Sequence, residues 1–513
     1  MSLGKRGNAE SGAEHAHSKQ MKIDSTNQTL DSESEYEEEV MDETAAVYDQ
    51  ISDVYLDTIN RSNLDFDFEQ LCSVSLSTTN IYACLVCGKY YQGRGPKTHA
   101  YFHSINDDHH VFINLKSRQA YILPDNYKID SKSLNDIKQV INPEYSRQSI
   151  DSLDTRERQA FDLQGKPYLP GFVGLNRIKS NSFMNVVIQL IAHVQPLRDM
   201  LLLLPSSKED ASKQPDVLLS KLSLLVRKIW HAQKFKAHVS PHELVQEIVS
   251  LSKKRFRLDR EGDPYELLIW LLNSLHIHLG GTRKRNSSTV YQAFQGEMLV
   301  KTLQGKADSN NTERKMPFLA LSLELPPKPL FTSTSLDDPA AGENEDDRAD
   351  IPQVPLMTLL QRYNGSLQPE QTSVFQLTKL PRYIICHIKR FTKNEFAIEK
   401  NPTVVNFPVR NLPFGQLLPL DTREMHGRET TYDLVINICH VGEQLPQTTP
   451  SNDITQSDVT AETTGSGESP FMVYIRNEAN GKWLMLHDLQ VKPIMPQMLF
   501  LSDSYIQVWK RND

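Results

Sequence analysis

The stretch from Gly171 to Asp199 constrains the fold of this chain most, because a turn-rich segment runs directly into a long apolar one. The apolar segment predicts a buried helix that begins near Ser182. Its apolar residues are Phe183, Met184, Val186, Val187, Ile188, Leu190 and Ile191. Ser182 therefore stands where free backbone N–H groups and the helix dipole favour a negative charge. A cysteine at this position would be a nucleophile of low pKa, but this chain has serine.

Length, charge and cysteine count set the broad class of protein. A chain of 513 residues is long enough for two or three domains. Its net charge of −8 argues against a globally basic surface for nucleic acid. Five cysteines, two of them in one Cys-x-x-Cys, indicate a reducing compartment and a metal rather than disulfides. No apolar run is long enough to span a bilayer, so we expect a soluble intracellular protein without a membrane partner.

The first 48 residues lack apolar periodicity and carry the acidic run DSESEYEEEVMDE. Such a segment buries too little apolar surface to offset the entropy of ordering it, so residues 1–48 are predicted to form a disordered acidic tail. The acidic run has two interpretations, a solvating tail or a docking site.

The first folded unit is predicted over residues 52–130. Cys84 and Cys87 form a knuckle, and His103 and His109 follow at a spacing that suits a closed tetrahedral zinc site. Four protein ligands leave no open position for water, so this one zinc would be structural. The alternative is a pair of buried free cysteines beside surface histidines.

Residues 131–168 are polar with short apolar clusters, which predicts a bridging segment of short helices. Residues 169–513 are predicted to form one large α+β domain. Two of its helices have clear starting signals, at Ser240-Pro241 and Asp263-Pro264, and short β-branched and aromatic runs dominate later. Two polar insertions, at about 332–351 and 442–469, interrupt the domain.

The large domain resembles the ubiquitin-specific proteases. Gly174, Leu175, Asn176, Met184, Asn185 and Gln189 match their cysteine box, EGDPYELLIWLLNSL matches their second conserved helix, and GKWLMLHDLQV matches their histidine box. The resemblance implies a cysteine-protease-like α+β fold. It also puts Ser182, Pro470 and His487 at the positions of the nucleophile, the general base and the orienting acid. Proline cannot accept a proton and serine depends heavily on a base, so this resemblance implies an inactive protease domain with no catalytic residues.

The first unit resembles the zinc finger of ubiquitin-specific proteases through CLVCGKYYQGRG and HAYFHSINDDHH. This resemblance implies a small α/β zinc-finger domain, with Cys72 and His99 as remnants of a lost second site. Arg94 falls on the family arginine that holds the free carboxylate tail of ubiquitin. Its other interpretation is an ordinary surface arginine.

The combination of a single-zinc finger, a GLNxIKxN cysteine box, YILPDNYKI and the closing SYIQVWKR resembles the inactive ubiquitin-specific-protease-like splicing factors of the spliceosomal tri-snRNP. This resemblance implies a nuclear, non-catalytic scaffold in pre-mRNA splicing, docked on tri-snRNP proteins and with weak ubiquitin binding. A basic run at Lys253, Lys254, Arg255 and Arg257 would allow a local contact with RNA. The alternative is a weak or unconventional deubiquitinating enzyme or ubiquitin-binding module, with His440 as a spare imidazole.

Overall fold

The computed structural model describes residues 55–204, 216–302, 312–327, 352–367, 373–393, 398–420, 430–442 and 469–512. The predicted acidic tail (1–48), the predicted insertion at 332–351 and nearly all of the one at 442–469 lie outside these residues. The chain divides into two compact units, Met1–Thr58 and Ile59–Asp513. In the first, the described part holds one short turn, η1 (Leu56–Thr58).

Residues 81–129 of the second unit, here called the finger region, contain one five-stranded antiparallel sheet with the order β2-β1-β3-β4-β5. The strands are β1 (Ile81–Cys84), β2 (Tyr90–Gln92), β3 (Val111–Asn114), β4 (Ala120–Ile122) and β5 (Tyr127–Ile129). The short helix η2 (Arg61–Asn63) precedes β1, and α2 (His99–Asn106) connects β2 to β3. This mixture matches the predicted small α/β domain.

Residues 131–168, the predicted bridging segment, contain short helices. They are η3 (Lys132–Leu134), α3 (Asn135–Ile141) and α4 (Arg147–Asp151), followed by the two-residue strands β6 (Ala160–Phe161) and β7 (Pro167–Tyr168). Helix α4 begins with a complete capping box between Ser146 and Ser149.

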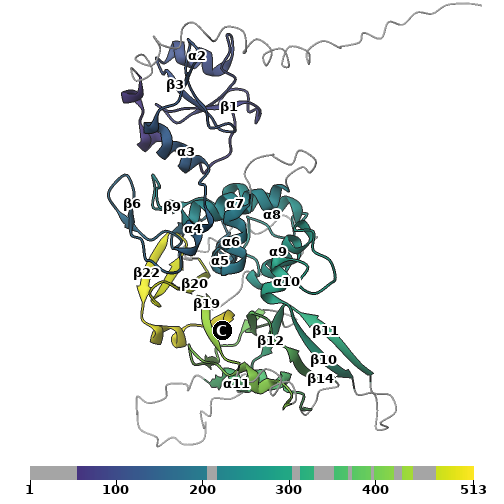
Figure 1. Ribbon diagram of the computed structural model, residues 1–513. Helices are drawn as coiled ribbons and strands as arrows, with labels where there is room; N and C mark the ends of the chain where they lie inside the picture. Colours follow the sequence, from purple (N-terminus) through teal and green to yellow (C-terminus); the bar gives the residue numbers. More distant parts are fainter. Residues whose placement is uncertain are drawn as a thin grey trace, which may run out of the picture. The chain divides into compact units, whose positions relative to one another are not determined.

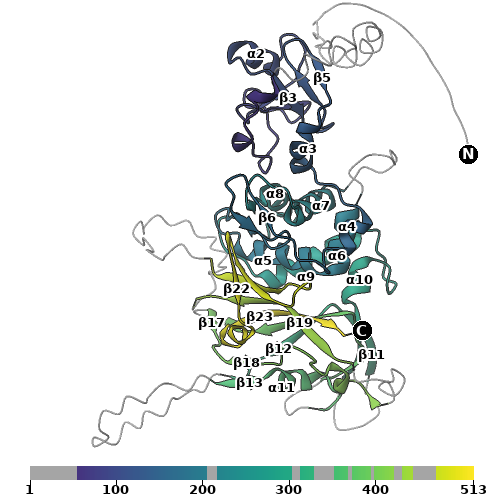
Figure 2. The ribbon, with the colours of Figure 1, turned by 60° about the vertical axis from the view of Figure 1, so that its left-hand side comes forward.

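The large domain combines a helical layer with a mostly antiparallel sheet. The helices are α5 (Ser182–His193), α6 (Gln195–Leu203), α7 (Val217–Trp230), α8 (His242–Leu251), α9 (Pro264–His278) and α10 (Thr289–Phe294). They gather on one side of the sheet (Figure 2). Helix α5 has eleven buried residues out of twelve, so it is a core helix, as the apolar run predicted. Among the described residues no single helix is long and apolar enough to cross a membrane, and only the bent pair α5–α6 meets those criteria together.

The main sheet has seven strands in the order β12-β15-β23-β19-β20-β21-β22. They are β12 (Ala320–Glu324), β15 (Tyr383–Lys389), β19 (Tyr432–His440), β20 (Phe471–Arg476), β21 (Trp483–His487), β22 (Gln490–Ile494) and β23 (Ser504–Arg511). All pairs are antiparallel except β12 with β15. The last described strand, β23, lies inside this sheet, beside β19 (Figure 2), and Figure 1 shows β19 next to β20. Its Trp509 is fully buried.

A separate three-stranded sheet has the order β11-β10-β14. Its strands are β10 (Gly296–Thr302), β11 (Thr312–Phe318) and β14 (Ser373–Lys379). The remaining elements are β8 (Gly174–Leu175), β9 (His238–Val239), β13 (Gln353–Pro355), α11 (Leu356–Leu360), η5 (Gln361–Tyr363), β16 (Phe391–Lys393), β17 (Ile398–Lys400), β18 (Val404–Asn406), η6 (Phe414–Leu417) and η7 (Pro496–Leu501). Helices and sheets in these proportions confirm the predicted α+β class.

Candidate functional site

The hydroxyl of Ser182 is buried at the first residue of α5. Its side chain has no exposed surface, and its Oγ donates a 2.9 Å hydrogen bond to Oε2 of Glu261. The backbone N–H of Phe183 points to the same carboxylate oxygen at 3.4 Å. A carboxylate therefore occupies the positive end of α5, where the helix dipole favours an anion.

Glu261 reaches Ser182 because the loop before α9 approaches α5 very closely. A Cβ at the next residue, Gly262, would lie 2.8 Å from the ring of Phe183, so only glycine fits without displacing that ring. Burial raises the pKa of Glu261, and the hydrogen bonds from Ser182 and Phe183 oppose this shift. The Arg177 guanidinium, 3.8 Å from Oε1, adds a compensating positive charge. Arg177 and the two hydrogen bonds thus offset the negative charge of Glu261, while its buried Oε1 accepts no hydrogen bond within the described residues.

Pro470, predicted from the family resemblance to stand at the general-base position, lies just before β20. Its carbonyl accepts a 2.7 Å hydrogen bond from the backbone N–H of Val441, which joins the ends of β19 and β20. A pyrrolidine ring offers neither a donor nor an acceptor. This position therefore contributes to the strand pairing and supplies no group that takes a proton.

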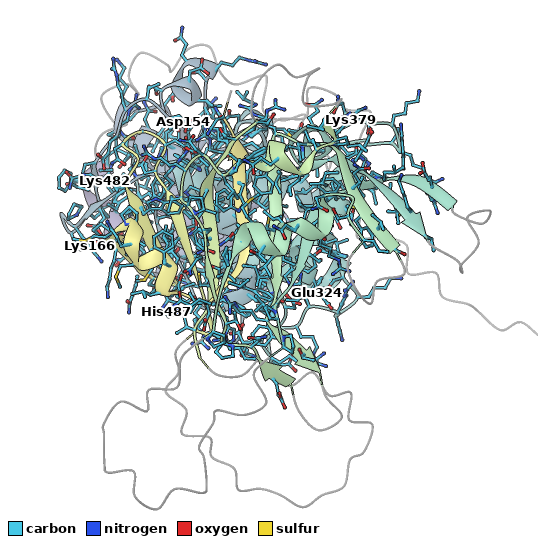
Figure 3. The ribbon with its side chains drawn as sticks, turned by 90° about the horizontal axis from the view of Figure 1, so that it is seen from below. Asp154, Lys166, Glu324, Lys379, Lys482 and His487 are labelled. Atoms are coloured by element: carbon cyan, nitrogen blue, oxygen red, sulfur yellow. The ribbon has the colours of Figure 1, made fainter. Side chains whose placement is uncertain are left out.

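His487 ends β21 at the edge of the domain (Figure 3). Its Nε2 lies 2.9 Å from the carbonyl oxygen of Ser469, and a carbonyl accepts, so this nitrogen carries the proton. The next residue, Asp488, accepts hydrogen bonds from the Ser469 hydroxyl and, at 3.3 Å, from Nδ2 of Asn185. Both side chains thus hold the segment before β20. Within the described residues, no hydrogen bond joins His487 to Ser182.

His440, the spare imidazole of the sequence analysis, lies at the end of β19 with 2% of its surface exposed. Its ring contacts Phe391 and Phe471 edge to face, and burial lowers its pKa to about 4. It is a neutral core residue near pH 7.

The four predicted zinc ligands come together. One ligand atom from each of Cys84, Cys87, His103 and His109 lies within 4.8 Å of the others. Within the described residues, this is the one such group of three or more metal-ligating side chains. A hydrogen bond from the Cys84 thiol lowers the pKa of Cys87 to about 4, which favours the thiolate that zinc binds.

Supporting contacts orient His103 in that group. Its ring stacks on Tyr91 with centroids 4.2 Å apart, and its Nδ1 pairs with the Asp107 carboxylate. A carboxylate on the second ring nitrogen is the usual support for a metal-ligating histidine. The donor set and its surroundings therefore fit a structural zinc ion.

Cys72 and His99 lie outside this cluster. Cys72 is fully buried, and its Sγ accepts from the backbone N–H groups of Ser75 at 3.4 Å and Gln92 at 3.3 Å. The Ser75 hydroxyl also donates to the Gln92 side chain. The Cys72 thiol is therefore surrounded by hydrogen-bonding groups, at the place where a second metal site would need further ligands.

Arg94, the residue matched to the ubiquitin-tail arginine, has its guanidinium 4.2 Å from the centroid of the Tyr121 ring. Its NH1 donates a 2.5 Å hydrogen bond to Oδ1 of Asn126. These contacts fix the side chain and leave it half-buried, so part of the group is accessible.

Glu261 and Ser469 were missed by the sequence analysis. Both flank matched motifs, because Glu261 opens EGDPYEL and Ser469 precedes Pro470. Only Ser469 stands beside a predicted catalytic position, and nothing in the sequence around Glu261 links it to Ser182. Its burial and its partner depend on tertiary packing.

Comparisons with known proteins find a matching family for the large domain and another for the finger region. Residues 173–509 match the family described as ubiquitin carboxyl-terminal hydrolase, and residues 72–134 match the zinc finger in ubiquitin hydrolases and other proteins. Ubiquitin carboxyl-terminal hydrolase 39 of Homo sapiens is 43% identical over 484 residues, which cover 90% of this chain and 80% of that protein.

Two similar fungal proteins carry names from RNA processing. The probable mRNA-splicing protein ubp10 of Schizosaccharomyces pombe is 38% identical, over 92% of this chain and 90% of its own. Pre-mRNA-splicing factor SAD1 of Saccharomyces cerevisiae is 31% identical, over 90% of this chain and 93% of its own. The crystal structure of an essential yeast splicing factor superposes with a TM-score of 0.68 at 29% identity, covering 90% of this chain and 100% of that one.

Proposed function

The chain belongs to the ubiquitin carboxyl-terminal hydrolase family, and from that premise we propose that it is a non-catalytic scaffold in pre-mRNA splicing. It supports the assembly or stability of the spliceosomal tri-snRNP in the nucleus. Relatives named as splicing proteins, similar over nearly the whole chain, support this role. The sites decide between scaffold and enzyme, because one fold hosts both.

One observation carries the non-catalytic part of the proposal: the Ser182 hydroxyl is buried and donates to Glu261. A serine nucleophile needs a base that takes its proton and an open face for the substrate carbonyl. Pro470 supplies no base, and His487 is committed to the carbonyl of Ser469. We therefore assign no catalytic role to Ser182, Pro470 or His487.

A second candidate function, a weak or unconventional deubiquitinating enzyme, has one observation in its favour. Glu261 is a carboxylate with a raised pKa in hydrogen-bond contact with Ser182, which is the contact a general base would make. The absence of exposed surface on Ser182 weighs against it, since a ubiquitin tail would have to reach that hydroxyl.

The finger region binds one structural zinc ion through Cys84, Cys87, His103 and His109 in this proposal. The zinc ion contributes folding free energy to this small domain, because the short strands of the finger region enclose little hydrophobic core of their own. Arg94 is assigned only a weak ubiquitin contact, since Tyr121 and Asn126 already hold its guanidinium. The principal partners are tri-snRNP proteins.

Depletion and rescue in cells test the scaffold role. Depletion is expected to raise the fraction of unspliced pre-mRNA, and wild-type protein and a Ser182→Ala variant are expected to restore splicing equally. A second assay measures cleavage of a fluorogenic ubiquitin carboxyl-terminal substrate, where no turnover is expected. Turnover that disappears in a folded Ser182→Ala variant, together with failed rescue, would replace the scaffold by an enzyme.

A further inference from the structure

The loop between α8 and α9 concentrates positive charge in a chain of net charge −8. Five of the eight residues from 253 to 260 are basic, namely Lys253, Lys254, Arg255, Arg257 and Arg260. Lys253 and Lys254 follow the end of α8 with φ angles of 52° and 64°. Two consecutive non-glycine residues in the left-handed region are uncommon. Both side chains are exposed there.

Internal ion pairs neutralise part of this charge. Arg255 pairs with Glu266 at 2.9 Å, and Arg257 pairs with Asp259. Within the described residues, the ammonium groups of Lys253 and Lys254 have no hydrogen-bond or ion-pair partner. Arg260 also has no hydrogen-bond or ion-pair partner in this part of the structure, although its charge acts on Asp259. The uncompensated positive charge of the loop is therefore carried by Lys253, Lys254 and Arg260.

The two lysines stand beside an open hollow of about 560 Å³. We call it the basic hollow, and its lining residues are Gln246, Val249, Ser250, Lys253, Lys254 and Leu258. Val249 and Leu258 are half-buried apolar side chains, and the nearby Leu251 is 42% exposed. The surface thus combines an aliphatic floor with a cationic rim.

The loop that lines the basic hollow is anchored to the segment around Ser182. The carbonyl of Leu258 accepts a 3.0 Å hydrogen bond from the backbone N–H of Ser180. Phe256 packs between Phe183 and Trp270. These contacts give the loop a fixed geometry, so a partner binding there loses little affinity to ordering it.

We propose that the basic hollow is a docking surface for an acidic polypeptide segment that carries an aliphatic side chain. Carboxylates of the segment pair with Lys253 and Lys254, and the aliphatic side chain lies against Val249 and Leu258. Charge complementarity steers the encounter, and apolar burial adds affinity. The partner is one of the proteins on which the proposed scaffold docks.

The same observations disfavour RNA as the occupant. No aromatic side chain lines the hollow, and the one aromatic residue of the loop, Phe256, is only 3% exposed. Single-stranded RNA is usually held by base stacking on exposed aromatic rings. Lys253, Lys254 and Arg260 are only three uncompensated cations and can neutralise few phosphates, so the electrostatic contribution to RNA binding is small.

The test measures fluorescence anisotropy with the full-length, zinc-loaded protein. The probe is a fluorescein-labelled twelve-residue peptide of alternating Glu and Asp with two central leucines. Its controls replace the acids by amides, or the leucines by serines. A labelled uridine dodecamer serves as the RNA probe, and all probes are titrated at low and physiological salt.

The test variant carries Lys253→Glu and Lys254→Glu. The matched control carries Arg283→Glu and Lys284→Glu, the same charge change at two exposed residues of another basic run. We expect an affinity loss of about tenfold or more in the test variant and less than about twofold in the control. The serine-substituted peptide is expected to bind about fivefold more weakly.

Three outcomes would overturn the inference: no binding of the acidic peptide, equal losses in both variants, or lysine-dependent binding of RNA alone. The measurement involves neither splicing nor ubiquitin, so its failure leaves the scaffold role standing. Conversely, a failed rescue of splicing does not alter the peptide titration.

Discussion

Removing the Ser182 hydroxyl is expected to cost stability rather than activity. In Ser182→Ala, the buried Glu261 carboxylate loses its 2.9 Å donor. A hydrogen bond to a charged group contributes about 1.5–3 kcal/mol to the free energy of unfolding. With Ser182 fully buried and Glu261 6% exposed, water cannot easily replace that donor. We therefore expect Ser182→Ala to lower the free energy of unfolding by about 2 kcal/mol.

A double-mutant cycle with Glu261→Gln isolates this interaction. Against a neutral amide the same hydroxyl contributes only about 0.5–1.5 kcal/mol, so Ser182→Ala should cost about 1 kcal/mol less in the Glu261→Gln background. Ser223→Ala is the matched control, because the Ser223 hydroxyl is buried and donates 2.7 Å to the neutral carbonyl of Leu201. Its cost should be the same in both backgrounds.

The assay is urea unfolding followed by tryptophan fluorescence at pH 7.5. Burial raises the pKa of Glu261 above its value in the unfolded chain. Protonation of Glu261 therefore adds stability below the unfolded pKa, and this contribution is lost as the pH rises through the folded pKa. Glu261→Gln should remove that part of the pH dependence. A cost of Ser182→Ala below about 0.5 kcal/mol, or equal costs in both backgrounds, would refute the assigned hydrogen bond.

Three further predictions follow from the same structure. Elemental analysis should find one zinc per chain, and Cys87→Ala or chelation should unfold residues 72–134 while the larger domain keeps its own urea transition; a single shared transition would contradict this. Burial lowers the pKa of His387 to about 3, so its stabilising contribution is complete above pH 6.5 and is lost as the pH falls through 3. His387→Phe, which keeps the stacking on Tyr265, should flatten that acid-induced fall in melting temperature, and an unchanged pH profile would exclude the histidine as its cause. Ser182→Cys should give neither ubiquitin cleavage nor fast alkylation at pH 7, because the thiol is buried and the Glu261 carboxylate raises its pKa; rapid labelling would show an open site.

Much of the fold could be predicted because the local sequence patterns agree with tertiary packing. The apolar run after Ser182 forms the buried helix α5, and Asp263 caps α9 by accepting a hydrogen bond from the backbone N–H of Tyr265. The zinc-ligand spacing predicted a cluster that the folded chain brings within 4.8 Å. In each case the residues that form the sequence pattern and the residues that they contact lie within a few turns or strands of one another.

The side-chain partners of Ser182 and Asp488 could not be predicted in the same way. Glu261 is 79 residues from Ser182, and Asp488 is 303 residues from Asn185. Nothing local to these side chains specifies their partners. The basic run beside them predicted charge, but only the structure shows that Arg255 and Arg257 are already paired.

The electrostatics of α5 explain how a serine and a glutamate stand together at the position that the family resemblance predicts for the nucleophile. The positive end of a buried helix stabilises an anion, and an uncompensated helix end in the core costs free energy. In a thiol protease, a thiolate beside an imidazolium meets that requirement. Here Glu261 supplies the anion and Ser182 donates to it. A cysteine introduced at 182 would compete with this carboxylate for the same positive field, so restored reactivity would require the base, the thiol and the removal of Glu261 together.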